Sequence, residues 1–353
     1  MNNNPSLPPG LSFFTFHAIS YLVDIYRKQI SPARTPLNFL TYFCMFPHLI
    51  SGPIIRYAQV KDELLERKLD QQLFTFGLYR FLVGFNKKLL IANLVSSLAD
   101  SAFSLSASAH LQFFDAWIGI AAYAVQIYFD FSGYSDMAIG LAAMAGFRFE
   151  ENFIRPYSSV SVKNFWKRWH ISLSLWLRDY LYIPLGGNKA SSCRTYRNLI
   201  IVFFLCGLWH GASFTFIFWG LWHGLFLILE RLGGGRVLEK APKILSRVYT
   251  LLVVLIGWVF FRAETIGDAF VYLRNMFTLS LSPTILTYHF SSCVALFFGI
   301  VICLLPDRFL PAPTCRQEDN FSGQVFCIQV ILTFLSISLL LSGARNPFIY
   351  FNF

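Results

Sequence analysis

The sequence predicts an all-α protein that crosses a membrane several times, and three observations support this. Hydrophobic residues make up 55% of the 353 residues and charged residues only 14%, against about 25% charged in a typical soluble domain. Phenylalanine alone fills 39 positions. Several apolar segments approach the length of about 20 residues that a membrane-spanning helix needs. A soluble fold of this size needs polar residues to cover its exterior, which this chain lacks.

Eight segments are candidates for membrane helices. Five of them are strong candidates because they are long and nearly free of charge, and three are weaker. We find no internal repeat and no low-complexity segment, so we expect one domain over residues 1–353. The strong candidates are 116–131, 199–229, 248–261, 288–305 and 325–341, and the weaker ones are 11–26, 37–55 and 73–98.

Segment 199–229 is too long for one straight helix in a bilayer. It holds 31 residues without a formal charge, or about 46 Å of helix against a hydrocarbon core of about 30 Å. Gly207 and Gly211 lie near its middle. We therefore expect a kink or a short break around His210.

Two weaker segments also depart from a simple span. Pro47 and the pair Gly52-Pro53 interrupt 37–55, which favours a broken or re-entrant element. Segment 73–98 contains three basic residues, which favours an interfacial position for that face of the helix. These residues are Arg80, Lys87 and Lys88.

The net charge of +10 does not indicate a nucleic-acid partner in so apolar a chain. We expect Lys and Arg to crowd loops and helix ends near anionic lipid headgroups. Basic loops at 27–34, 189–197 and 231–247 fall on both expected sides of the membrane, so the positive-inside rule assigns no orientation. The seven cysteines form no CxxC pair and no metal-ligand spacing, so we predict neither disulfides nor a metal site.

His210 is the first candidate catalytic residue. It lies in Leu-Trp-His-Gly-Ala within the charge-free segment 199–229. An ionisable group at bilayer depth is costly unless it is partnered or hydrated, and it indicates a functional site. The ordinary pKa of histidine, about 6.5, suits proton removal from an attacking hydroxyl. The alternative is a structural histidine bonded to a neighbouring helix, and for His223 we favour such a structural or interfacial role.

Residues 161–178 form a tryptophan-rich pattern that fits one amphipathic helix, which lies at the membrane boundary or dips into the membrane. The simpler interpretation is an anchor with snorkelling lysines. The alternative is a basic wall that steers an anionic acyl carrier toward His170 and the interior. The expected apolar face carries Phe165, Trp166, Trp169, Leu173, Trp176, Leu177 and Tyr180, and the opposite stripe carries Lys163, Lys167, His170, Ser174 and Arg178.

Two further arrangements could take part in chemistry. Asp130 and Asp136 lie at the end of an apolar helix and need partners, which Arg148 or Arg155 could supply. A structural role, or one that orients a histidine, fits these carboxylates better than a glycosidase-like acid and base. Cys206, one helical turn before His210, could be a nucleophile, but a buried thiol in apolar surroundings is usually inert.

Several ordered motifs resemble the membrane-bound O-acyltransferase family, and within it the branch similar to alginate O-acetyltransferases. One is Phe-Pro-His-Leu-Ile-Ser-Gly-Pro-Ile-Ile-Arg-Tyr at 46–57. Another is Phe-Trp-Lys-Arg-Trp-His-Ile-Ser-Leu-Ser at 165–174. The resemblance runs from about residue 7 to residue 353. The other matching stretches are 128–140, 155–157, 185–188, 207–212, 218–220, 258–263 and 347–351.

The resemblance implies a bundle of many helices around a central tunnel, with the family's catalytic histidine at His210 and its second histidine at His170. It also implies further membrane helices before the segment matching 11–26, where this chain begins. We therefore expect an N-terminally shortened acyltransferase domain, as a truncated product, a fragment or a variant completed by a partner. We count as candidate substrate- or donor-binding residues Lys163, Asn164, Lys167, Arg168, Ser174, Asp130 and Asp136.

The expected function is O-acyl transfer across a bacterial inner membrane, with no tightly bound cofactor. Acetyl-CoA or an acyl-carrier thioester is the expected donor, and a hydroxyl of an envelope polysaccharide or of a periplasmic partner protein is the expected acceptor. His210 is expected to take the proton of that hydroxyl, and His170 is one candidate donor to the oxyanion. The alternatives are a catalytically inactive remnant or scaffold, and a transporter, which usually shows a repeat.

Overall fold

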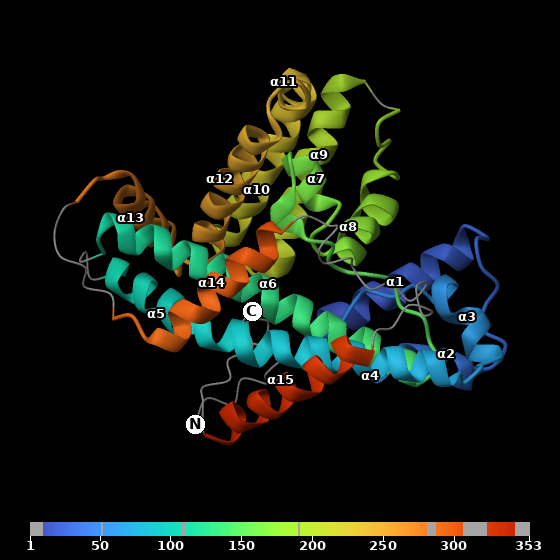
Figure 1. Cartoon of the computed structure of the whole chain (residues 1–353). Helices are drawn as coiled ribbons and strands as arrows, with labels where there is room; N and C mark the ends of the chain where they lie inside the picture. Colours follow the sequence, from blue (N-terminus) through green and yellow to red (C-terminus); the bar gives the residue numbers. More distant parts are fainter. Residues whose placement is uncertain are drawn as a thin grey trace, which may run out of the picture.

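The computed structural model describes residues 10–50, 52–107, 111–189, 191–280, 287–305 and 323–342. Within these ranges all regular elements are helices, which confirms the predicted all-α class. The helices α4, α5 and α6 lie across the molecule, and α7, α9, α10 and α12 stand upright against them (Figure 1). The C-terminal motif at 347–351 lies outside the described residues.

The helices follow one another through short connections. The first half of the chain contains α1 (Leu11–Tyr26), α2 (Pro36–Phe43), η1 (Phe46–His48), α3 (Tyr57–Leu65), α4 (Gln71–Asn86), η2 (Lys87–Ala92), α5 (Asn93–Ala107) and α6 (Phe113–Met144). The second half contains η3 (Pro156–Ser158), α7 (Val162–Trp166), α8 (Ile171–Leu177), η4 (Arg178–Tyr182), α9 (Ser192–His210), α10 (Phe214–Leu229), η5 (Glu230–Gly234), α11 (Gly235–Lys240), α12 (Lys243–Arg262), α13 (Ile266–Phe277), α14 (Phe290–Leu304) and α15 (Gly323–Leu341).

Most of the predicted segments are helices with similar bounds. α1 covers 11–26 as predicted, and α12, α14 and α15 cover the predicted apolar segments to within a few residues. Segment 37–55 is broken, as expected, into α2 and the single turn η1. Among the described residues, four helices are long and apolar enough to cross a membrane: Gln71–Ser106, Phe214–Lys240, Lys243–Arg262 and Gly323–Leu341.

The helix α6 is the centre of the bundle and is longer than predicted. It is buried along most of its length. Glycines let α4 approach it closely. A Cβ at Gly84 would lie 2.4 Å from the carbonyl oxygen of Gly133, and one at Gly77 would lie 2.6 Å from that of Gly140. The two pairs are spaced seven residues apart on each helix, so the same faces meet over two turns.

The interfacial position predicted for the basic residues in α4 and η2 does not hold for Arg80 and Lys88, which are buried. Arg80 is buried and pairs with Asp136 at 2.7 Å and with Glu151. Lys87 pairs with the other oxygen of Asp136 at 2.6 Å, and Lys88 pairs with Asp130 at 2.6 Å. Charges inside a membrane protein persist where an opposite charge lies beside them. Asp136 therefore finds its partners on α4 and η2, not in Arg148 or Arg155.

The predicted break near His210 is confirmed. α9 ends at His210, and α10 starts four residues later at Phe214. The two helices form a tight hairpin because glycines line their contact: a Cβ at Gly207 would lie 2.3 Å from the carbonyl oxygen of Phe216. The break places the imidazole of His210 at a helix end inside the bundle.

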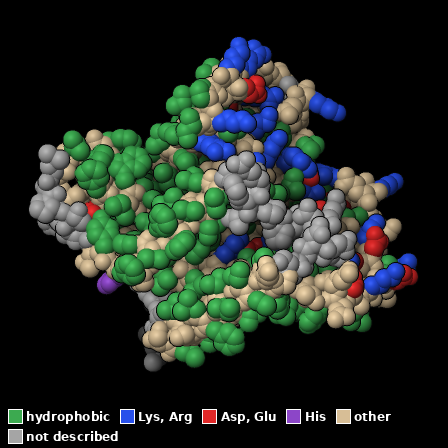
Figure 2. All heavy atoms as spheres, viewed as in Figure 1, with side chains coloured by type: hydrophobic (Ala, Val, Ile, Leu, Met, Phe, Trp, Pro, Cys, Tyr) green, Lys and Arg blue, Asp and Glu red, His purple; other side chains and the backbone are tan. Residues whose placement is uncertain are grey.

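Charge is distributed unevenly over the surface. Hydrophobic side chains cover much of the face shown in Figure 2, whereas Lys and Arg gather at the end formed by α11 and the start of α9, and around α1 to α3. Arg231 in η5 reaches Asn188, before α9, at 2.6 Å, so the basic loops 189–197 and 231–247 lie at one end. The molecule therefore has a strongly basic end at α11 and the start of α9, and a second group of basic side chains around α1 to α3.

Candidate active site

The segment 161–178 is not one helix, so this part of the prediction is wrong. α7 stops after Trp166, and α8 starts at Ile171. Between them His170 has a left-handed φ of 42°. The chain turns here because it bonds to a neighbouring segment instead of continuing its own helix: the N–H of Ile171 donates to the carbonyl of Asn152 at 2.9 Å.

This turn changes which side chains are buried. His170 is only 1% exposed, whereas Lys163 and Lys167, expected on the same stripe, are exposed. Phe165 and Trp169 belong to the hydrophobic core and not to a membrane-boundary face. The turn therefore separates the histidine from the basic residues and places it inside the protein.

Asn152 holds the ring of His170 and determines which ring nitrogen carries the proton. The Oδ1 of Asn152 lies 3.1 Å from the backbone nitrogen of Ser172 and 3.2 Å from Nδ1 of His170. A backbone N–H can only donate, so this oxygen is an acceptor and Nδ1 donates to it. The amide nitrogen of Asn152 in turn donates to Ser135 at 3.1 Å.

The other nitrogen of His170 is then available as an acceptor. A neutral imidazole with its proton on Nδ1 has a lone pair on Nε2. In the described structure this Nε2 is buried and has no hydrogen-bond partner. Phe131 meets the ring at 86°, with 4.8 Å between ring centroids, and Phe153 is stacked on it at 6.3 Å. In its neutral form His170 thus presents Nε2 as an acceptor in an aromatic enclosure.

His210 lies beside His170, with Trp209 in contact with both rings. The centroid of Trp209 lies 4.6 Å from that of His210 and 6.4 Å from that of His170. The two histidines are near enough to interact electrostatically. Trp219 and Phe261 approach His210 edge-on, each at 5.0 Å. The structure therefore brings the two predicted catalytic histidines together, and His210 keeps 7% of its surface exposed.

His223 and Cys206 lie nearby, but both are enclosed. His223 is fully buried and packs against Trp166 and Trp219 at 5.3 Å, so the predicted interfacial alternative does not hold for it. Cys206, one turn before His210, is 1% exposed and belongs to the core. Within the described residues no three His, Cys, Asp or Glu side chains are grouped to hold a metal ion.

Lys163 and Asn164 line a cleft of about 760 Å³ at the basic end. Arg231 and Arg236 line it from the other side. The carboxylate of Glu230 fixes α7 against this cleft, because it accepts the backbone N–H groups of Val162 at 2.6 Å and Lys163 at 3.0 Å. Five basic or amide residues therefore line one cleft together with two acidic ones, and α7 leads inward from it toward His170. The five are Lys163, Asn164, Asn188, Arg231 and Arg236, and the two are Glu230 and Glu239.

The other candidate binding residues do not line this cleft. Arg168 donates to Ser158 at 3.1 Å, and Ser174 bonds to the backbone of Trp169. Asp130 and Asp136 lie in the ion pairs with η2 and α4 described above. Lys167 is exposed beyond the end of α7. A continuous tunnel also stays a prediction, since neither histidine lines any of the three cavities described in this chain.

The fold defines a helical membrane protein in which two buried histidines both contact Trp209. The profile of the membrane-bound O-acyltransferase family matches residues 28–266. The chain belongs to this family, in the branch of the alginate O-acetylases.

Named relatives agree with this assignment. The protein named probable alginate O-acetylase AlgI of Pseudomonas aeruginosa is 49% identical over 272 residues, which are 77% of this chain and 52% of that protein. The one of Pseudomonas putida is 41% identical, over 98% of this chain and 75% of that protein. The peptidoglycan O-acetyltransferase of Helicobacter pylori is 33% identical, also over 98% of this chain and 75% of that protein. The chain spans about half the length of the Pseudomonas aeruginosa relative.

Sequence reasoning missed Asn152. It lies in Glu-Glu-Asn-Phe, outside any helical period, and 18 residues before the histidine that it binds. Its role follows from the contact between two irregular segments. No local pattern in the sequence indicates that contact.

Proposed function

We propose that this protein transfers an acyl group from a thioester donor to a hydroxyl, with His210 as the general base. The observation that supports this most directly is the pair of buried imidazoles around Trp209, one of which presents an acceptor nitrogen. The names of the relatives add support: they include an alginate O-acetylase and a peptidoglycan O-acetyltransferase. A Teichoic acid D-alanyltransferase of Bacillus subtilis is 31% identical over 58% of this chain.

In the proposed reaction the acceptor hydroxyl gives its proton to His210 as its oxygen attacks the thioester carbonyl. The tetrahedral intermediate then collapses to the ester, the carbon–sulfur bond breaks, and the leaving sulfur takes the proton back from His210. Holding both substrates beside one imidazole supplies proximity, which accounts for a large share of such catalysis.

We assign His170 to binding of the acceptor and not to the oxyanion. Its one N–H is committed to Asn152, so a neutral ring has no second N–H for an oxyanion. Its Nε2 is instead suited to accept a hydrogen bond from a second hydroxyl of the acceptor, next to the one that attacks. His170 would then align the acceptor, while His210 removes the proton of the attacking hydroxyl.

The donor, in this proposal, is acetyl-CoA or an acyl-carrier thioester that docks at the basic cleft. Lys163, Arg231 and Arg236 outnumber the two glutamates that line that cleft, Glu230 and Glu239, and would attract the phosphates of either donor. An excess of Lys and Arg marks the cytoplasmic side of membrane proteins. We therefore orient the α11 end toward the cytoplasm of a bacterial inner membrane, and place a periplasmic partner protein or an envelope polysaccharide on the other side.

The test compares two buried histidines that lie at similar distances from Trp219. Membranes that hold the full chain are supplied with acetyl-CoA labelled in the acetyl group, and ester-linked label in envelope polymer is counted. His210→Ala should abolish transfer, whereas His223→Ala should retain most of it at equal protein level. Undiminished transfer by His210→Ala would remove the assignment, and no transfer by the unmodified chain would favour an inactive scaffold.

A further inference from the structure

A second cleft is lined in part by the segment that positions His170. It has a volume of about 320 Å³ and is bordered by α4, η2, α6, α14 and α15. Charged and apolar side chains both line it. The charged ones are Arg80, Lys87, Asp136, Glu151 and Arg155, and the apolar ones include Leu90, Ile91, Ile302 and Leu332.

The charged side chains of the lining favour an anion. Three positive side chains, Arg80, Lys87 and Arg155, face two carboxylates, Asp136 and Glu151, so the lining carries one net positive charge. Both carboxylates are already bound by Arg80. Lys87 keeps 25% of its side chain exposed while it pairs with Asp136 at 2.6 Å. An incoming anion would thus meet the exposed part of Lys87, while Asp136 and Glu151 stay bound to Arg80.

The apolar side chains of the lining favour a ligand with hydrocarbon chains. α15 is attached to α4 through Asn86, which donates to Gln329 at 3.0 Å and accepts from Ser336 at 2.8 Å. The rest of α15 is largely exposed, including Ile331 at 68% and Phe334 at 70%. Such a helix needs lipid against its outer surface. The charged side chains of the cleft therefore lie beside an apolar surface that lipid chains would follow.

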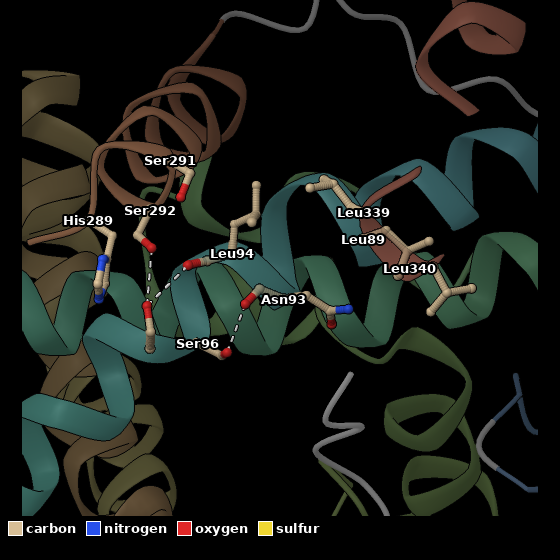
Figure 3. A pocket seen from close by; sticks show the side chains of 10 residues that line it. Leu89, Asn93, Leu94, Ser96, His289, Ser291, Ser292, Leu339 and Leu340 are labelled. Atoms are coloured by element: carbon tan, nitrogen blue, oxygen red, sulfur yellow. Dashed lines mark hydrogen bonds between the residues drawn. The ribbon is translucent and has the colours of Figure 1, made fainter. Parts of the chain in front are cut away.

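We propose that this cleft binds an anionic phospholipid, with the phosphate at Lys87 and Arg155 and the acyl chains along α14 and α15. Basic pockets between membrane helices recognise such headgroups. The neighbouring cavity between α5, α14 and α15 offers a comparison (Figure 3). It has about 250 Å³, and no Lys, Arg, Asp or Glu lines it.

The bound lipid would touch the segment that orients His170. Glu151 and Phe153 line the cleft, and Asn152 between them bonds His170. Phe153 is also stacked against the His170 ring, at 6.3 Å between ring centroids. A headgroup in the cleft would therefore brace the segment that holds the histidine in place, which links the lipid site to the proposed reaction without depending on it.

The test uses the purified full chain in phosphatidylcholine nanodiscs, with or without phosphatidylglycerol. After the protein is released from the nanodiscs, native mass spectrometry counts the phosphatidylglycerol molecules that stay bound to it. Lys87→Gln should weaken retention about fivefold, as expected for one cation near an anionic lipid. Leu332→Trp, which fills the cleft and leaves its charges in place, should also reduce retention. Lipid retention is measured independently of acyl transfer. The lipid proposal can therefore be tested whatever the outcome for His210.

Two matched controls make the result specific. Arg274→Gln removes a basic side chain from the exposed side of α13, and Leu340→Trp fills the uncharged cavity on the same helix as Leu332. Both should retain the lipid as the unmodified chain does. Equal retention by all four variants would overturn the proposal. So would full displacement of the lipid by inorganic phosphate, since the ligand would then be a free anion.

Discussion

The Oδ1 of Asn152 accepts the Nδ1–H of His170 at 3.2 Å, and this contact leaves Nε2 of the buried imidazole as an acceptor. The same oxygen is bound by the backbone N–H and the hydroxyl of Ser172. The backbone therefore fixes the amide, and the amide fixes the ring. This chain of contacts joins the irregular segment after α6 to the turn between α7 and α8.

Replacement of Asn152 by Ala should slow acyl transfer without preventing insertion. Leaving a buried donor without its partner costs about 1–3 kcal/mol, which corresponds to about a five- to 150-fold lower rate if the ring must be fixed for reaction. The measurement is transfer of labelled acetyl groups in membranes. Asn275→Ala on α13 is the control, and it should remain active.

The variant Asn152→Asp separates positioning from simple structural support. A carboxylate still accepts the Nδ1–H, but its charge stabilises the imidazolium. Because the neutral ring is the active form in this mechanism, the rise of activity with pH should shift to higher pH. An unshifted profile would mean that Asn152 only supports the fold.

Cys206→Ser should leave transfer within about twofold of the unmodified chain. The thiol is buried in the core, where a thiolate is costly to form, and in the proposed reaction His210 acts on the hydroxyl directly. The measurement pairs the transfer assay with a search for label bound covalently to the protein. Trapped label that disappears with the substitution would instead establish a Cys206 acyl intermediate.

The sequence predicted the parts of this fold that local properties determine. α1 has the predicted bounds because an apolar segment ends in polar residues on its C-terminal side. The break at His210 follows from the length of segment 199–229 and its glycines. These features depend on a bilayer thickness and on a few neighbouring residues, so one sequence suffices to find them.

Features that depend on distant partners were not predictable in this way. The hydropathy around Arg80 resembles that of an interfacial helix, and only the presence of Asp136, 56 residues later, makes a buried position possible. The pattern of 161–178 fits one helix, but the hydrogen bond from Ile171 to Asn152 ends it. Histidines 170 and 210 were both found as candidates, whereas their juxtaposition required the tertiary structure.

Gly84→Ala should destabilise the protein because α4 and α6 touch at this point. The added Cβ would lie 2.4 Å from the carbonyl oxygen of Gly133, which is backbone and cannot turn away. Overpacking of this kind typically costs about 1–3 kcal/mol. Thermal unfolding in detergent should show a lower midpoint. Gly323→Ala is the matched control, since nothing lies within 4 Å of its Cβ, and an equal midpoint for both variants would contradict this packing.

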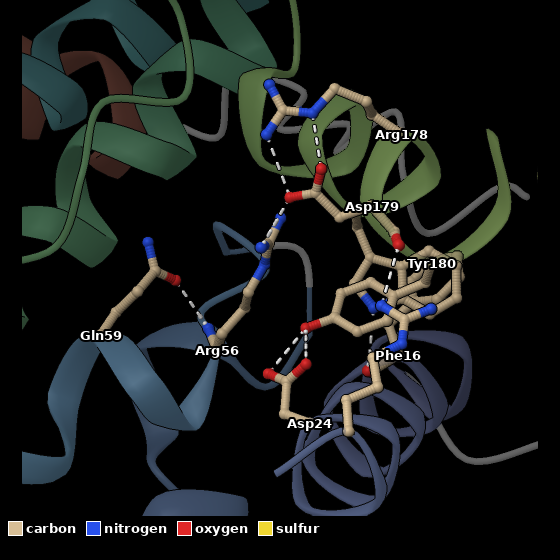
Figure 4. A network of polar contacts seen from close by, with 9 residues as sticks. Phe16, Asp24, Arg56, Gln59, Arg178, Asp179 and Tyr180 are labelled. Carbon is tan, nitrogen blue, oxygen red and sulfur yellow. Dashed lines mark hydrogen bonds and ion pairs between the residues drawn. The ribbon is translucent and has the colours of Figure 1, made fainter. Parts of the chain in front are cut away.

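Asp179 links α1 and the segment before α3 to the turn that follows α8. Its carboxylate binds Arg56 at 2.8 Å and Arg178 at 2.6 Å, and the neighbouring Tyr180 donates to Asp24 on α1 (Figure 4). Burial alone would raise the pKa of Asp179, but hydrogen bonds and charge from the two arginines outweigh it, so the pKa of this carboxyl is lowered.

This lowered pKa predicts a stability contribution that depends on pH. A carboxyl with a depressed pKa in the folded state stabilises that state above its unfolded pKa, about 3.9, and loses the effect as pH falls through the folded value. Asp179→Asn should therefore lower the unfolding midpoint at neutral pH, and the difference from the unmodified chain should shrink below about pH 4. Asp62→Asn, on the exposed side of α3, is the control and should show little difference at either pH. The difference in unfolding midpoint between Asp179→Asn and the unmodified chain could instead stay the same below about pH 4. That result would mean that the contact acts through packing and not through the ion pair.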